Sequence, residues 1–171
     1  MPDVLEAFEV FLREIVRAGN SIVVPTPAYI PFLSVPRLYG VEVLEIPMLC
    51  AGAGESSGRN DEWLFDFDAI EQAFANGCHA FVLCNPHNPV GRVWSADELR
   101  RLGDICIAHG VTILADEIHA DFAYPGHDVT MFGTLGERYA GHCYEFTAPT
   151  KTFNIAGLET SNLINPGKET R

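Results

Sequence analysis

The chain has 171 residues, of which 47% are hydrophobic and 20% are charged, and this composition is typical of one soluble globular domain. Its formal net charge of −12 excludes the basic face that binding to nucleic-acid phosphates requires, so we expect no nucleic-acid partner. No stretch approaches the roughly 20 apolar residues of a membrane span, and the start lacks the pattern of a signal peptide. We therefore expect no membrane partner and a cytoplasmic location.

The first 47 residues predict two helices, each followed by a strand. Asp3 and Glu6 have the spacing of a capping box, and the apolar residues that follow keep a helical period until Gly19 ends it. Pro25 and Pro27 are expected to stop the short strand that comes next. The predicted elements are a helix at residues 4–16, a strand at 21–24, a helix at 29–39 and a strand at 41–46.

The rest of the chain continues to alternate between strands and helices. Residues 48–62 are rich in Gly, Ser and Asn and predict a surface loop. Asp66 is expected to cap one later helix, and Ser95 with Glu98 forms the capping box of another. Apolar strands are predicted at residues 80–84, 111–115, 143–147 and 160–164. This order predicts an α/β fold, a three-layer α/β/α sandwich with a mainly parallel sheet covered on both faces.

Three chemically distinct side chains follow successive strands. Asn88 lies in a turn bracketed by prolines, Asp116 closes the next strand, and Lys151 follows the strand at residues 143–147. In an open α/β sheet, this edge is where ligands bind. Pyridoxal phosphate needs an amine for a Schiff base, a carboxylate for the pyridine nitrogen and a donor for the ring hydroxyl. We therefore predict a pyridoxal 5′-phosphate site in which Lys151 is the catalytic residue.

Each of these residues also has an ordinary structural interpretation. Most lysines are solvated surface groups, although partial burial of Lys151 would favour the neutral amine that attacks an aldehyde. Either Asp116 or its neighbour Glu117 would serve to cap the next element. Asn88 would serve equally well in turn chemistry, because Asn-Pro pairs initiate turns without any ligand.

Further side chains are candidates for contact with the cofactor. Tyr29, which prolines hold in place, offers a flat ring for stacking, with core packing as the alternative. Thr147 and Thr150 offer hydroxyls that would donate hydrogen bonds to a phosphate. His119 is expected to be a hydrogen-bonded structural histidine rather than a metal ligand. The five cysteines are odd in number and lack the spacing of a zinc site, so we expect free thiols and no metal.

Three segments together resemble a known enzyme family. They are Asn85-Pro86-His87-Asn88-Pro89-Val90-Gly91, Ala115-Asp116-Glu117-Ile118-His119 and Lys151-Thr152-Phe153-Asn154-Ile155-Ala156-Gly157-Leu158. In this order they resemble the fold-type I pyridoxal-phosphate enzymes. More narrowly, they resemble the cystathionine β-lyase (cysteine C–S lyase) branch of the class I/II aminotransferase family. The resemblance covers essentially the whole chain.

The resemblance implies a role for four of the candidate residues. Lys151 would form the Schiff base with the cofactor and move the proton of the substrate Cα. Asp116 would pair with the pyridinium nitrogen, and Asn88 would contact the ring hydroxyl. Tyr29 would stack on the ring. We expect these roles because the resemblance implies each of them for a particular residue of this sequence.

Two substitutions and the length distinguish this chain within the family it resembles. Related aminotransferases usually have a tyrosine where His119 stands, and the histidine points toward the lyase branch. Thr150 keeps the hydroxyl of the more usual serine and remains a cofactor-binding candidate. Family members are considerably longer. Residues 1–171 are therefore expected to form a partial cofactor-binding large domain, without its N-terminal portion and without the C-terminal small domain.

The implied activity is β-elimination from cystathionine or a related cysteine S-conjugate, which gives a thiol, pyruvate and ammonia. The expected partners are a small amino-acid thioether substrate and, in the intact family member, a second identical subunit. An aminotransferase that uses the same residues is the nearest alternative. A non-catalytic remnant of such an enzyme is another. A metal hydrolase built on Asp116, Glu117 and His119 is the most distant.

Overall fold

The computed structural model describes residues 1–51 and 62–165 of the chain. Its centre is a six-stranded sheet in the order β2-β1-β5-β6-β7-β8, in which β8 is antiparallel to β7 and the other neighbours are parallel. A second, antiparallel sheet pairs β3 (Leu49–Ala51) with β4 (Glu62–Leu64). The strands of the main sheet are β1 (Ser21–Thr26), β2 (Glu42–Pro47), β5 (Ala80–Cys84), β6 (Thr112–Asp116), β7 (Cys143–Thr147) and β8 (Asn162–Ile164).

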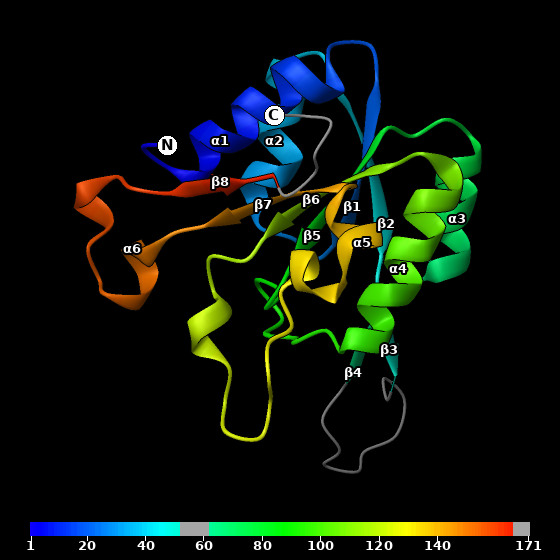
Figure 1. Cartoon of the computed structure of the whole chain (residues 1–171). Helices are drawn as coiled ribbons and strands as arrows, with labels where there is room; N and C mark the ends of the chain where they lie inside the picture. The colour runs from blue at the N-terminus through cyan, green and yellow to red at the C-terminus, as the bar shows by residue number, and fades with distance from the viewer. Residues whose placement is uncertain (52–61, 166–171) are drawn as a thin grey trace.

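Helices cover both faces of the main sheet, which confirms the predicted three-layer α/β/α fold (Figure 1). One face carries α1 (Val4–Phe11), the π-helical turn η1 (Leu12–Val16) and α2 (Ile30–Leu38). The other carries α3 (Phe67–Ala75), α4 (Ala96–His109) and α5 (Glu137–Ala140). The remaining short elements are α6 (Pro149–Thr152) and the 3₁₀ turns η2 (Ala120–Phe122), η3 (Phe132–Leu135) and η4 (Ala156–Leu158).

The strands separate two hydrophobic cores because successive side chains point to opposite faces of a sheet. In β1, Val23 packs in the core under α3 and α4, whereas Ile22 and Val24 pack in the core under α1 and α2. In β5, Phe81 and Val82 divide between the two cores in the same way. Burial on both faces explains why these strands are apolar throughout, as a parallel sheet requires.

N-cap hydrogen bonds form at three helices where the sequence predicts caps, but Asp3 and Glu6 do not form the predicted capping box at α1. Asp3 accepts a hydrogen bond from the Val4 N–H at 2.5 Å, and Asp66 accepts one from the Ala69 N–H at 3.0 Å. At α4, Ser95 and Glu98 exchange hydrogen bonds, which completes a capping box and is worth about 1 kcal/mol of helix stability. Local sequence therefore specifies where these helices begin.

Pro25 does not stop the first strand, which is a correction to the prediction. β1 continues through Pro25 to Thr26, and both residues stay in register with β2. The ladder from β1 to β5 contains only Ile22 and Val23. Pro25 therefore lies beyond the place where a missing N–H would break that ladder, and the strand tolerates it.

The loop prediction for residues 48–62 is wrong at its two ends. Residues 49–51 and 62–64 form the antiparallel pair β3 and β4, in which Cys50 lies opposite Trp63. This pairing joins segments that are distant in sequence, so local composition did not indicate it. The part of the prediction that falls on residues 52–61 lies outside the described residues.

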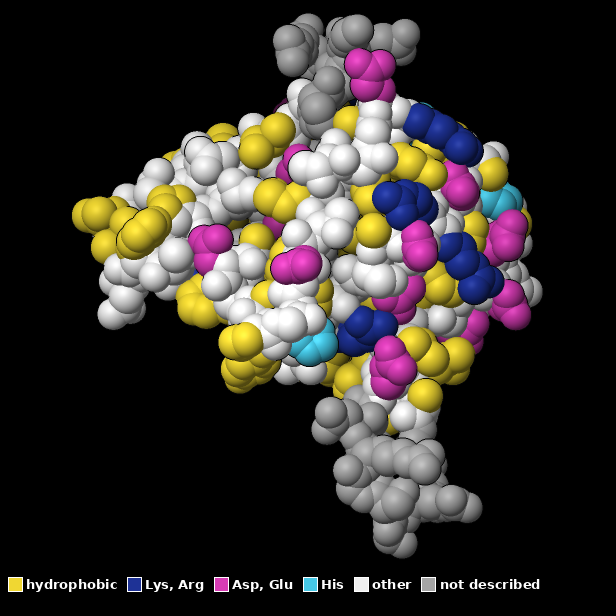
Figure 2. Space-filling view, turned by 60° about the horizontal axis from the view of Figure 1, so that its bottom comes forward, with side chains coloured by type: hydrophobic (Ala, Val, Ile, Leu, Met, Phe, Trp, Pro, Cys, Tyr) yellow, Lys and Arg dark blue, Asp and Glu magenta, His cyan; other side chains and the backbone are white. Residues whose placement is uncertain are grey.

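The face that carries α4 has basic and acidic side chains interspersed (Figure 2). Arg100 pairs with Asp97 at 2.8 Å, and Arg138 pairs with Asp104 at 3.1 Å. These exposed pairs each contribute little to stability. In the part of the chain that the structure describes, no helix has the length and apolar character needed to cross a bilayer.

Candidate active site

Four parallel strands place the candidate residues along one edge of the sheet. Asp116 is the last residue of β6, where it lies in register with Cys84 of β5 and Phe146 of β7. Tyr29, Asn88 and Lys151 follow the ends of β1, β5 and β7, respectively, within a few residues. The edge is the carboxyl end of the parallel strands, which is where ligands bind in open α/β sheets.

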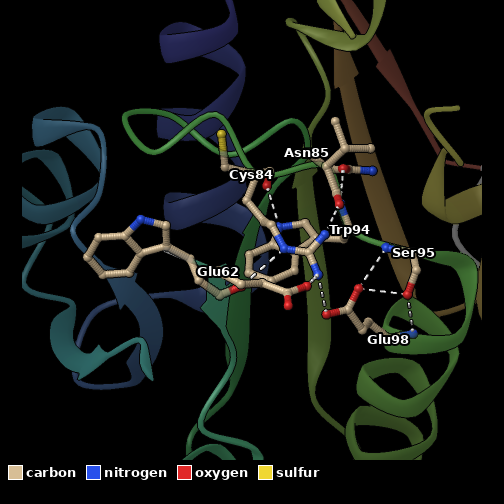
Figure 3. Close-up of polar contacts among 9 residues, drawn as sticks. Glu62, Cys84, Asn85, Trp94, Ser95 and Glu98 are labelled. Carbon is tan, nitrogen blue, oxygen red and sulfur yellow. Dashed lines mark hydrogen bonds and ion pairs between the residues drawn. The ribbon is translucent and has the colours of Figure 1, made fainter. Parts of the chain in front are cut away.

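The turn that carries Asn88 is fixed by buried hydrogen bonds (Figure 3). The Asn85 side chain accepts from the Trp94 N–H at 3.2 Å and donates to the Thr130 carbonyl at 2.9 Å. The Trp94 indole N–H donates to the Cys84 carbonyl at 3.0 Å. Asn85 and Trp94 are completely buried. Asn85 therefore has a structural role, and it holds the turn so that Asn88 lies at the sheet edge.

Replacement of Asn85 by alanine is expected to destabilise the chain by about 2–4 kcal/mol, because the buried Trp94 N–H and the partly buried Thr130 carbonyl would lose their hydrogen-bond partner. Urea denaturation would measure the change in the free energy of unfolding. The exposed Asn76, at the end of α3, provides the control, and Asn76→Ala should change stability by less than about 0.5 kcal/mol. Equal effects of the two substitutions would contradict the structural role of Asn85.

Asp116 is a buried carboxyl with few partners. Its side chain is 6% exposed, and its Oδ1 accepts a hydrogen bond from the Ile118 N–H at 3.2 Å. Burial raises the pKa of Asp116 from 3.8 to about 6, and the nearby charge of Asp3 raises it further, while Lys151 and the Ile118 N–H act in the opposite direction. A cation placed against this carboxyl would offset the cost of its burial.

Two cavities adjoin Lys151, and the smaller of them also adjoins Asp116. The smaller, of about 130 Å³, brings together five of the predicted site residues: Tyr29, Asn88, Asp116, His119 and Lys151. The larger, of about 660 Å³, also has Asn88, His119 and Lys151 in its lining. Those three residues border both cavities. The larger volume lies within the range of small-molecule sites.

Lys151 is exposed, which corrects the expected partial burial. It lies in the four-residue helix α6 and not in an open turn. The hydroxyl of Thr152 donates to Asp121 at 2.6 Å, which ties α6 to η2, but neighbouring Phe153 is 69% exposed. Lys151 is therefore an exposed residue that nevertheless lines both cavities.

Tyr29 and His119 both line the smaller cavity. Tyr29 is 39% exposed and its ring meets Phe32 edge-on at 5.6 Å, so it is not an ordinary core residue. His119 is half-buried and borders both cavities. Burial lowers the pKa of His119, and the Lys151 charge lowers it further. His119 therefore enters the site as a neutral imidazole at neutral pH.

The two threonines considered for phosphate binding are in other surroundings than the cavity linings. Thr150 is buried, and its carbonyl accepts from the Ile155 N–H at 3.0 Å. The Thr147 hydroxyl accepts a hydrogen bond from the Asn162 side chain of β8 at 3.2 Å. Neither threonine is part of the lining of either cavity. The phosphate-binding role of these hydroxyls stays a prediction.

Glu117 lines neither cavity and has a structural role, unlike its neighbour Asp116. Its Oε1 accepts from the Phe132 N–H at 2.8 Å, and the Glu145 side chain accepts from the Gly133 N–H at 2.5 Å. A Cβ at residue 133 would lie 2.6 Å from Glu145 Oε2, so any other residue there would force the Glu145 carboxylate to shift. Burial, followed by the neighbouring Glu145, raises the pKa of Glu117 to about 8.

A proton shared between Glu117 and Glu145 explains how two buried carboxyls tolerate each other. Glu117 Oε2 has no hydrogen-bond donor among the described residues. When Glu117 is protonated, its own O–H donates to Glu145, which removes both the repulsion and the missing hydrogen bond. The pair connects β6 and β7 to η3, beside the sheet edge that carries Asp116.

The Glu117→Gln substitution is expected to remove a pH dependence of stability. A glutamate whose pKa is raised on folding from 4.5 to about 8 stabilises the fold fully below about pH 4.5, and this stabilisation is lost as pH rises through 8. Glutamine keeps the acceptor and can donate to Glu145. Between pH 5 and 9, the free energy of unfolding of the unmodified chain should fall by more than about 1 kcal/mol relative to the variant.

Thermal unfolding at several pH values, with the exposed Glu137→Gln as the control, would measure this difference. The control should follow the unmodified chain at every pH. Parallel stability curves for Glu117→Gln and the unmodified chain would contradict the shared proton.

Sequence reasoning missed part of the cavity lining. Asp3, Val4 and Leu5, at the start of α1, border the smaller cavity, and so does Cys84. The sequence indicated that Asp3 caps a helix, but it did not indicate that the helix begins at the same sheet edge as Lys151. No group of three or more His, Cys, Asp or Glu side chains in residues 1–51 and 62–165 is arranged to hold a metal ion.

Comparison with known families identifies the family to which the chain belongs. Residues 4–158 match the model of the family described as aminotransferase class I and II. The chain belongs to this family. The match includes all the predicted site residues, and it confirms the family that the three sequence motifs indicated.

The curated relatives within this family include cystathionine β-lyases. The chain is 38% identical over 168 residues to cystathionine beta-lyase PatB of Bacillus subtilis, a match that covers 98% of this chain and 41% of PatB. It is 34% identical to cystathionine beta-lyase of Corynebacterium glutamicum, covering 96% of this chain and 40% of that protein. The chain therefore spans about 40% of the length of these relatives.

Solved structures show the same relationship in three dimensions. Cystalysin from Treponema denticola, which contains a pyridoxal 5′-phosphate cofactor, superposes with a TM-score of 0.90 at 33% identity, over 98% of this chain and 41% of cystalysin. The pyridoxal-phosphate-bound C–S lyase of Staphylococcus hominis superposes with a TM-score of 0.88 at 26% identity, over 98% of this chain and 40% of the lyase.

Proposed function

We propose that this chain is the central part of the large domain of a pyridoxal 5′-phosphate-dependent C–S lyase. The protein that contains it would cleave cystathionine or a related cysteine S-conjugate to a thiol, pyruvate and ammonia. The observation that carries the proposal is the cavity that unites Lys151, Asp116 and Asn88. The named relatives support the lyase assignment over the aminotransferase assignment.

The groups around the smaller cavity fit the ring and the aldehyde of this cofactor. Asp116 is buried and its raised pKa reflects the lack of a sufficient cationic partner; a protonated ring nitrogen would supply one. Lys151 offers a primary amine, Asn88 an amide donor, and Tyr29 a partly exposed aromatic face, all in the lining of one cavity. The donor set therefore matches the chemical groups of the cofactor.

When bound, pyridoxal phosphate supplies an aldehyde that reacts with amines and a protonated ring that withdraws electrons from the substrate Cα. Lys151 would hold the cofactor through its Nζ, and its amine would take the Cα proton once an amino-acid substrate is bound. Asp116 would keep the ring nitrogen protonated. Asn88 and Tyr29, which line the same cavity as Lys151, would hold the ring in place.

His119 and the larger cavity would serve the sulfur end of the substrate. The Cβ–S bond breaks, the sulfur leaves as a thiol with a proton, and water converts the remaining three-carbon unit to pyruvate and ammonia. His119 is neutral near pH 7 and borders both cavities with Lys151. A neutral imidazole there accepts and returns a proton without adding a fixed charge.

The experiment that tests the proposal adds pyridoxal phosphate and cystathionine to the protein and measures the products by chromatography. We expect thiol, pyruvate and ammonia in equal amounts, with no requirement for a 2-oxo acid. Transfer of the amino group to an added 2-oxo acid without thiol release would favour the aminotransferase alternative. Failure to bind the cofactor at all would favour a non-catalytic remnant.

We propose three further properties of the intact protein. It would act as a homodimer, and the exposed apolar side chains Phe122, Tyr124, Phe153 and Leu158 support an additional contact surface on this side. It would take a small amino-acid thioether as substrate. It would be cytoplasmic, which the five unpaired cysteines, four of them buried, support.

A further inference from the structure

Three charged groups line the smaller cavity, and one of them has no role in the mechanism above. Asp116 and Lys151 are assigned to the ring nitrogen and the aldehyde, whereas Asp3 is the third. His119, which also lines the cavity, is neutral near pH 7 because burial lowers its pKa. Once Asp116 is ionised, the cavity lining carries two negative charges against one positive charge.

Asp3 occupies a position that is chemically suited to an anion. It caps α1, and the first two residues of that helix, Val4 and Leu5, line the same cavity. N–H groups in a first helical turn have no carbonyl one turn earlier to pair with, and the helix dipole favours negative charge there. The Asp3 carboxylate accepts the Val4 N–H at 2.5 Å, so the chain supplies an anion of its own.

We propose that Asp3 is a specificity-determining residue of this cavity, which weakens binding of pyridoxal phosphate relative to unphosphorylated pyridoxal. The proposal rests on the proposed function, because it takes the ring to lie beside Asp116 and Lys151. A phosphate ester carries between one and two negative charges at neutral pH. Asp3 repels that charge and competes with it for the N–H groups of the first turn of α1.

The charge of Asp3 acts within the cavity and not only at the surface. Although the Asp3 residue is exposed overall, its carboxylate raises the pKa of the buried Asp116 carboxyl. A phosphate in the same cavity is subject to the same repulsion. Pyridoxal has the same ring, aldehyde and ring nitrogen but lacks the phosphate, so Asp3 discriminates between the two compounds without touching the reacting atoms.

The Asp3→Asn substitution tests the proposal, because asparagine has the same shape and is an equally good N-cap but carries no charge. Glu6→Gln is the matched control, since Glu6 is an exposed acid in the first turn of the same helix and is absent from the cavity lining. Each variant and the unmodified chain would be titrated with pyridoxal phosphate and with pyridoxal at low ionic strength. The absorbance of the covalent adduct gives the dissociation constant.

We expect Asp3→Asn to bind pyridoxal phosphate about three- to tenfold more tightly than the unmodified chain, while its affinity for pyridoxal changes less than about twofold. Glu6→Gln should resemble the unmodified chain with both compounds. The gain should shrink as salt is added, because an exposed charge is screened.

Equal affinities of the unmodified chain and Asp3→Asn for pyridoxal phosphate would overturn the proposal, and so would an equal gain for both compounds. Asp3→Ser, a second neutral N-cap, must behave as Asp3→Asn does, and circular dichroism checks that both variants are folded. If the proposed function is wrong, the result is different: neither the unmodified chain nor any variant forms an adduct at Lys151 with either aldehyde.

Discussion

Replacement of Lys151 by alanine is expected to abolish the near-visible absorption band that the chain develops with pyridoxal phosphate. The band requires a covalent bond between an amine and the cofactor aldehyde. Lys151 is the lysine that borders both cavities. The sequence contains one other lysine, Lys168. Removal of Lys151 should therefore eliminate the specific adduct completely.

Lys168→Ala is the matched control for this experiment. It removes the same chemical group from the chain and should leave both the band and its intensity unchanged. The Lys151→Ala chain should retain weak, non-covalent binding of the cofactor, because the groups assigned to the ring remain in place. A normal band in Lys151→Ala, or its loss in Lys168→Ala, would contradict the assignment of Lys151.

The Asp116→Asn substitution should make the ligand-free chain more stable above pH 6. The pKa of Asp116 is raised on folding from 3.8 to about 6, so the fold has its full stability below about pH 4 and loses part of it as pH rises through 6. At 1.36 kcal/mol for each pKa unit, the loss amounts to about 3 kcal/mol at pH 8. Asparagine avoids this loss because it has no charge to bury and keeps an acceptor for the Ile118 N–H.

The same substitution should weaken cofactor binding, because the ring nitrogen would lose its anionic partner. Urea denaturation at pH 4 and pH 8 measures the change in stability, and titration with pyridoxal phosphate measures the change in cofactor affinity. Asp68→Asn, in which an exposed acid is removed from α3, should change neither. An Asp116→Asn chain that is less stable than the unmodified chain at pH 8, or that binds the cofactor equally well, would refute this account of Asp116.

Asp116→Asn should therefore stabilise the ligand-free chain and weaken cofactor binding. These opposite effects are expected of a carboxyl that is kept for binding at a cost in stability. A carboxyl with a purely structural role gives the same sign in both measurements, since its loss weakens the fold and thereby the site. Asp116 and Glu117 are adjacent in sequence and both buried, yet only Asp116 lines the cavity with Lys151. Comparison of Asp116→Asn with Glu117→Gln therefore distinguishes a binding role from a structural role at two neighbouring positions.

Much of the fold could be predicted because its signals are local. Asp66 and Ser95 begin helices where the sequence indicated, and the apolar run before Asp116 forms a buried strand. Pairings between distant segments left no such signal. Pro25 continues a strand because the ladder on one side has already ended, and this depends on where β5 lies, not on the residues around Pro25.

The site was predictable to the extent that each residue follows a strand of the same parallel sheet. Asn88, Asp116 and Lys151 meet at one edge for this reason. The position of Asp3 depends on how α1 packs across the sheet, and the exposure of Lys151 depends on how much of α6 is covered. Both are properties of tertiary packing, which sequence spacing does not encode.

The most direct test of the central claim is to add pyridoxal phosphate to the unmodified chain, reduce it with borohydride and locate the modified residue by peptide mass spectrometry. Lys151, Lys168 and the N-terminal amine are the competing amines. We predict one modification for each chain, on Lys151. Modification on Lys168 or the N-terminus, or no modification at all, would contradict the claim that the amine, the acid and the amide form one cofactor site.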